Sequence, residues 1–96
     1  MFLKIHRSPQ GDVVAACDRE LMGKRLTHGD VEIVISESFY GSTPANEEEV
    51  RKALRDAGNI NLMGKRVVRI AIDMELITEK GCIIFSGVPH AQIFRV

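Results

Sequence analysis

The segment GVPHAQ at residues 87–92 places an imidazole and a carboxamide two positions apart. In an extended chain His90 and Gln92 point to the same side. They could bind one ligand together, or His90 could act as a general acid or base while Gln92 and Asn61 orient a polar substrate. Alternatively, the imidazole hydrogen-bonds a backbone carbonyl and fixes the final strand. The residues alone leave both interpretations open.

The pentamer LMGKR occurs twice, at residues 21–25 and 62–66. The flanking sequences do not align, so the repeat does not indicate a duplicated domain. Each copy gives a glycine turn with two adjacent cations, which is suited to binding phosphates. The alternative is that the Leu-Met pairs pack inward while the cations are only solvated. The four cations are Lys24, Arg25, Lys65 and Arg66.

Several common cofactor and metal motifs are missing from the sequence. Neither LMGKR copy has the first glycine or the final Ser or Thr of a nucleotide-binding P-loop, and no G-x-G-x-x-G occurs. The histidines and cysteines are scattered, without C-x-x-C or H-x-x-x-H spacing. Cys17 and Cys82 lie in apolar runs, where burial raises a thiol pKa and disfavours nucleophilic chemistry. We therefore expect no metal and no cofactor.

The composition describes an ordinary globular domain. The chain has 96 residues and a mass of 10.7 kDa, with 45% apolar and 27% charged residues, so we expect one domain over residues 1–96. Thirteen basic and thirteen acidic residues cancel, which excludes a strongly basic nucleic-acid module but allows a local basic patch. No apolar run reaches membrane-spanning length and no targeting motif is present, so we expect a cytoplasmic protein without membrane or DNA partners.

The hydrophobic patterns predict about three helices and five or six strands. Residues 2–7 alternate and predict a strand, and with the turn at 8–12 and a second strand at 13–17 they predict a hairpin. Residues 31–36 predict a third strand. Asp18 could cap a short helix, and residues 36–44 are rich in turn formers. A further helix could start at Thr43-Pro44 or, alternatively, at the capping pair Asn46 and Glu49, and it should end at Gly58. Residues 82–87 predict a strand, and residues 88–96 predict a last strand or an extended tail.

Residues 62–77 fit either a strand or a helix. Their patterned length without a turn signal favours a helix, which Asn61 could cap. One apolar stripe contains Met63, Val67 and Ile70, and a second contains Val68, Ile72 and Leu76. Two apolar stripes predict that this helix is the central one of a small α+β domain with a mixed or antiparallel sheet.

Five stretches together resemble the archaeal family called domain of unknown function 424. They are ACDRELMGK at 16–24, FYG at 39–41, NEEEV at 46–50, NINLMGKRVV at 59–68 and GVPHAQIFRV at 87–96. The likeness covers nearly the whole chain, and GVPHAQ is its most specific piece. It implies a small archaeal protein of one domain with no assigned activity, and it supports the helix over 62–77. The positions it marks are Asp18, Gly23, Lys24, Phe39, Tyr40, Gly41, Asn61, Gly64, Pro89, His90 and Gln92.

We expect a module that binds structured RNA or the ribosome. Five cations near the predicted turns would contact phosphates, while Tyr40, His90 and Gln92 would read shape or a base edge. The cations are Lys24, Arg25, Lys65, Arg66 and Arg69. This hypothesis requires the cations, the aromatic loop and the imidazole to lie on one face. The alternatives are a small enzyme that uses His90, and a protein-interaction subunit or homodimer that covers a strand edge; the chain could be a monomer or a homodimer.

Overall fold

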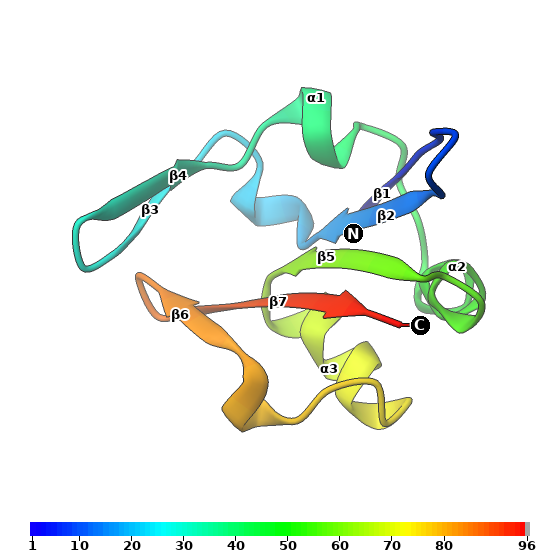
Figure 1. The fold of residues 1–96 in the computed structure, drawn as a ribbon. Coiled ribbons are helices and arrows are strands. Elements are labelled where there is room, and N and C mark those ends of the chain that lie inside the picture. The colour runs from blue at the N-terminus through cyan, green and yellow to red at the C-terminus, as the bar shows by residue number, and fades with distance from the viewer. Residues whose placement is uncertain (96) are drawn as a thin grey trace.

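A five-stranded mixed sheet organises the molecule (Figure 1). The computed structural model describes residues 1–95, and over these residues it confirms the α+β class. Strands β2 and β5 run parallel, and every other neighbouring pair in this sheet is antiparallel. The strand order is β1 (Phe2–His6), β2 (Val13–Cys17), β5 (Asn59–Met63), β7 (Val88–Phe94) and β6 (Ile83–Phe85).

The connection between the parallel strands β2 and β5 contains most of the remaining elements. Parallel neighbours require a long crossover, and here it spans residues 18–58. It begins with a 3-10 turn, η1, and a separate two-stranded hairpin that extends beyond the main sheet (Figure 1). The elements are η1 (Arg19–Leu21), β3 (Arg25–His28), β4 (Val31–Val34), α1 (Glu37–Tyr40) and α2 (Glu47–Arg55).

Each face of the main sheet buries its own apolar cluster. On one face α2 and α3 (Lys65–Asp73) cover side chains that include Val14, Ile60 and Leu62. On the opposite face Tyr40 of α1, with residues of η1 and the hairpin, covers Ala15, Cys17, Met63 and Phe85. Alternate residues of β2 and β5 therefore enter different clusters, because successive side chains of a strand point to opposite faces.

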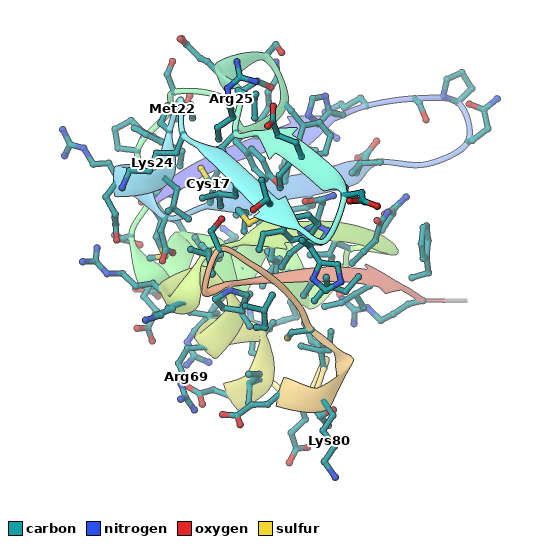
Figure 2. All side chains as sticks on the ribbon, turned by 90° about the vertical axis from the view of Figure 1, so that its left-hand side faces the viewer. Cys17, Met22, Lys24, Arg25, Arg69 and Lys80 are labelled. Atoms are coloured by element: carbon teal, nitrogen blue, oxygen red, sulfur yellow. The ribbon has the colours of Figure 1, made fainter. Side chains whose placement is uncertain are left out.

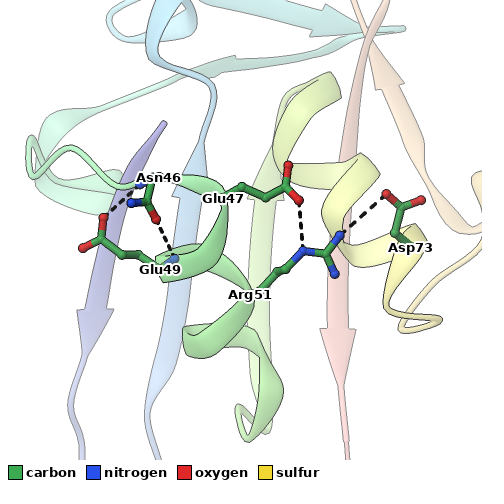
Figure 3. A network of polar contacts seen from close by, with 5 residues as sticks. All are labelled: Asn46, Glu47, Glu49, Arg51 and Asp73. Atoms are coloured by element: carbon green, nitrogen blue, oxygen red, sulfur yellow. Dashed lines mark hydrogen bonds and ion pairs between the residues drawn. The ribbon is translucent and has the colours of Figure 1, made fainter.

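Helix α2 begins at the second of the two predicted starts, not at Thr43-Pro44, and it is tied to α3 by an arginine (Figure 3). Asn46 accepts a hydrogen bond from the backbone N–H of Glu49 at 2.8 Å, and Glu49 accepts one from the N–H of Asn46 at 3.0 Å. Arg51 pairs with Glu47 at 3.0 Å and approaches Asp73 of α3 at 3.9 Å. The capping box is confirmed, although the helix ends at Arg55, three residues before Gly58.

The helix predicted over 62–77 is present but shorter, because it starts at Lys65 and ends at Asp73. Leu62 and Met63 complete β5, a central strand that the sequence analysis missed. Both faces of β5 are covered, so its sequence lacks the polar–apolar alternation of a half-exposed strand. Asn61 lies inside β5 and does not cap α3. The helix covers one face of the sheet beside α2, so its second apolar stripe has another role, described below.

Two local predictions also need correction. Asp18 precedes only the three-residue turn η1, and its side chain makes no hydrogen bond to that turn. Residues 36–44 contain the short helix α1, which Ser36 caps by accepting a hydrogen bond from the N–H of Phe39 at 3.3 Å. The sequence signal for α1 was the serine three positions before Phe39.

The two C-terminal strands are present and pair as a hairpin, whose turn uses Ser86 and Gly87 from the end of the strand predicted over 82–87. Ser86 and Gly87 join β6 to β7 with φ values of 49° and 80°, as a two-residue turn with two left-handed positions requires. A 3-10 turn, η2 (Glu79–Gly81), precedes β6. Among the described residues, no helix is both long and apolar enough to span a membrane.

Candidate functional site

Exposed cations gather where β2 and β5 end. Figure 2 looks onto this end and shows Lys24 and Arg25 beyond η1 and Arg69 on α3. Lys65 and Arg66 form the first turn of α3, and Arg66 approaches Glu20 of η1 with 3.9 Å between Nη2 and Oε1. We call Lys24, Arg25, Lys65, Arg66 and Arg69 the cationic end. The structure thus brings both LMGKR copies to one region of the molecule.

The acidic side chains near the cationic end neutralise it only in part. Arg25 pairs closely with Glu32 across the hairpin, at 2.5 Å. The contacts of Arg66 with Glu20 and of Arg69 with Glu79 are 3.9 and 4.0 Å, beyond hydrogen-bond length. Solvent-exposed ion pairs of this kind contribute little interaction energy. The guanidinium groups of Arg66 and Arg69 therefore keep most of their capacity to bind an anion.

A groove borders the cationic end between α3 and β6. It has a volume of about 540 Å³, and its apolar lining is Val68, Ile72, Ile84 and Pro89. Lys65, Arg66 and Arg69 also line it, together with Glu79 and Cys82. Val68 and Ile72 belong to the second apolar stripe of the predicted helix. Val68, 2% exposed, and Ile72 also pack in the core cluster of this sheet face, so the second stripe is in part core and in part the lining of a surface groove.

Asp18 holds the cationic end in place. Its carboxylate, 3% exposed, accepts hydrogen bonds from the backbone N–H groups of Arg66 at 3.0 Å and Val67 at 3.1 Å. Its own N–H donates to the carbonyl of Met63 at 3.0 Å. The end of β2 therefore caps α3, which follows directly after the neighbouring strand β5. This contact couples the position of Arg66 to the sheet.

Three further predicted site residues meet on the sheet face covered by α1. The hydroxyl of Tyr40 donates to Oδ1 of Asn61 at 2.6 Å, and Asn61 lies opposite Gln92 in the β5–β7 ladder. Tyr40 is buried, and burial raises the pKa of its hydroxyl above the ordinary value. Of these three residues, only Gln92 is exposed. Tyr40 thus fastens α1 to the sheet, and the hypothesis that it contacts a ligand is not supported by its position.

His90 is half-buried, and its imidazole hydrogen-bonds the backbone of the neighbouring strand β5. Its Nδ1 lies 2.9 Å from the carbonyl oxygen of Leu62, and its ring meets the edge of Phe85 with centroids 5.8 Å apart. Because that carbonyl can only accept, Nδ1 carries the proton. None of the three hollows described in residues 1–95 is lined by His90. The structure therefore brings the cations to one region, whereas Tyr40 is buried and the Nδ1 of His90 is engaged by a backbone carbonyl.

Burial lowers the pKa of His90 below its ordinary value of 6.5. The imidazole of His90 therefore binds a proton more tightly in the unfolded chain than in the folded one. The free energy of unfolding of the native protein should fall as the pH drops below about 6.5. His90→Asn retains a donor near the Nδ1 position but does not titrate, whereas His90→Ala should cost about 2 kcal/mol at pH 7.5. Urea unfolding at pH 7.5 and 5.5 measures both effects. Equal pH dependence of the native protein and His90→Asn would contradict this account.

The two cysteines differ in burial. Cys17 is fully buried, and desolvation raises the pKa of its thiol to about 11. Cys82 lies at the groove with intermediate exposure, and desolvation also raises the pKa of its thiol. The expectation of complete burial is therefore correct for Cys17 only. Both thiols stay protonated near neutral pH, which suits packing better than nucleophilic attack.

Comparison with known proteins identifies the family. The family described as protein of unknown function (DUF424) matches residues 6–96. The chain belongs to the DUF424 family. This DUF424 chain is also similar to the crystal structure of an uncharacterized conserved protein from Methanopyrus kandleri. The two share 27% identity with a TM-score of 0.80, over 97% of this chain and 89% of that chain. None of the curated proteins matches the chain.

Sequence reasoning missed two parts of the site in this DUF424 protein. In the sequence, the groove lining appeared only as the apolar stripe that contains Val68 and Ile72. No short-range pattern indicated that Ile84 lies in the same groove. The capping role of Asp18 was also missed, because its partners lie 48 and 49 positions away. The family resemblance had marked Asp18 and Gly64 without a reason. Their contact supplies one, since a Cβ on Gly64 would lie 2.3 Å from Cγ of Asp18.

Proposed function

We propose that this protein is a binding module whose cationic end contacts the phosphates of structured RNA. The observation that carries the proposal is the gathering of both LMGKR copies and Arg69 at one end of a chain with zero net charge. Phosphate contacts supply most of the affinity of such modules, and they orient the protein on the nucleic acid. A local cationic surface on a neutral protein therefore binds in one orientation.

Structured RNA fits this surface better than DNA major-groove recognition does. Double-stranded RNA is recognised largely by its shape and by backbone contacts, which need exposed cations but no helix inserted into a groove. Helix α3 packs against the sheet, and its first turn is engaged by Asp18. The same proposal includes association with the ribosome and a cytoplasmic location. It also includes an archaeal source, which the similarity to the Methanopyrus kandleri protein supports.

Charge reversal tests the proposal. Lys65→Glu with Arg66→Glu should weaken binding to a hairpin RNA at least tenfold at low salt and flatten its salt dependence. Lys52→Glu with Arg55→Glu, on α2, changes the net charge equally and is the matched control. Fluorescence anisotropy across a range of salt concentrations measures both. If the native protein shows no salt-sensitive retention of RNA at low ionic strength, the proposal is wrong.

A protein-interaction subunit or homodimer is the second candidate function. Val31 and Val34 on the hairpin are 54% and 51% exposed, and Ile83 of β6 is 48% exposed. Large apolar side chains left exposed on a hairpin and on an edge strand are the kind of surface that a protein partner could cover. Light scattering distinguishes the two functions, because a monomer that binds RNA supports the first and a stable dimer without RNA affinity supports the second. The hypothesis of an enzyme that uses His90 has no supporting contact in this geometry.

A further inference from the structure

The groove between α3 and β6 combines an apolar lining with a cationic rim. Val68 and Ile72 come from α3, Ile84 from β6 and Pro89 from β7. A volume of about 540 Å³ is in the range of pockets that enclose a small molecule. The lining of the groove includes three cations, Lys65, Arg66 and Arg69, and one glutamate, Glu79. A ligand that fits has a compact apolar or flat body and carries negative charge.

The rim of the groove belongs to the cationic end. Lys65 and Arg66 begin α3 and line the groove, and Arg66 also approaches Glu20 of η1. Within residues 1–95 the guanidinium groups of Arg66 and Arg69 make no carboxylate contact shorter than 3.9 Å. One polyanionic ligand can thus contact the cationic end and continue into the groove, where an arginine can also stack on a planar group.

We propose that the groove receives one unpaired nucleotide of the bound RNA. The base lies against Ile72, Ile84 and Pro89, and its phosphate is bound by Lys65 and Arg69. This inference rests on the proposed function and adds the preference for an unstacked nucleotide next to a helical stem. An acidic peptide would match the charge of the rim, but an apolar lining directly beside three cations suits a flat base joined to its phosphate better than a row of carboxylates.

The experiment compares one RNA hairpin with the same hairpin carrying a single bulged nucleotide. We expect the native protein to bind the bulged hairpin about five- to tenfold more tightly. Ile84→Ser should remove this preference and leave affinity for the plain hairpin unchanged. Ile84 is 48% exposed on an edge strand, so the substitution should preserve folding. Val31→Ser, on the exposed hairpin outside the groove, should retain the preference.

A second measurement locates the nucleotide directly. Uridine 5′-monophosphate, titrated into the isotope-labelled native protein, should shift the amide resonances of Ile72, Ile84 and Gly87. The inference would be overturned if the mononucleotide shifted other resonances instead. It would also be overturned if an acidic peptide shifted the resonances of these three residues and the mononucleotide did not. Salt-sensitive binding without preference for the bulge overturns the inference and leaves the proposed function standing. Absence of salt-sensitive RNA binding overturns both.

Discussion

Replacing Gly64 by alanine should lower the free energy of unfolding by about 3 kcal/mol. Gly64 has a φ of 124°, a conformation that side chains other than glycine rarely adopt. A Cβ there would lie 2.3 Å from Cγ and 2.6 Å from Oδ2 of Asp18. Asp18 is buried and fixed by two hydrogen bonds, so it cannot move aside without breaking them. Urea unfolding monitored by circular dichroism measures the loss.

The other LMGKR copy provides the matched control. Gly23 also has a positive φ, 82°, but a Cβ there would meet no atom within 4 Å. Gly23→Ala should therefore cost only the conformational strain, about 1 kcal/mol. Equal losses at Gly23 and Gly64 would show that the contact with Asp18 contributes nothing. The two substitutions thus separate backbone strain from steric conflict within one identical pentamer.

Substituting Asp18 by alanine should destabilise the protein by about 3 kcal/mol as well. The change leaves the N–H groups of Arg66 and Val67 without their acceptor, and each orphaned donor costs about 1–3 kcal/mol. A protein of this size has a total stability of about 5–10 kcal/mol, so either substitution removes a large share. Hydrogen exchange at Arg66 and Val67 should accelerate more than exchange in α2.

Asp18→Asn is the conservative comparison. Asparagine retains one acceptor oxygen but turns an NH₂ group toward the second N–H donor, so we expect an intermediate loss of about 2 kcal/mol. In Asp18→Ala the added cost of Gly64→Ala should shrink, because the carboxylate that a Cβ would strike is gone. Additive losses in that double variant would contradict the proposed contact between β2 and α3.

The proposed RNA binding depends on these two residues only through geometry. Neither Asp18 nor Gly64 lines the groove. Both fix the start of α3, from which Lys65, Arg66 and Arg69 project. The charge-reversal variants of the cationic end should therefore change RNA affinity with little effect on stability, because their side chains are exposed. Binding and folding are then affected by different substitutions at the same corner of the fold.

Local sequence determined the elements whose signals are complete within a few residues. The hairpin of β1 and β2 follows from alternation around a turn, and the start of α2 follows from Asn46 and Glu49. The turn between β6 and β7 follows from Ser86 and Gly87, and it places His90 and Gln92 on one side of β7. In each case the deciding interactions join residues that are close in the chain.

Tertiary structure alone decided the central strand and the arrangement of the candidate site. Residues 59–63 form a strand because β2 and β7 flank them and both faces are covered, conditions that lie far away in the sequence. The cap of α3 comes from Asp18, and the groove needs Ile84 beside Ile72. The residue types were readable from the sequence, but which cations share a surface and which aromatic is buried depend on long-range packing. Packing buries apolar area contributed by segments far apart in the chain, so a short stretch of sequence does not determine it.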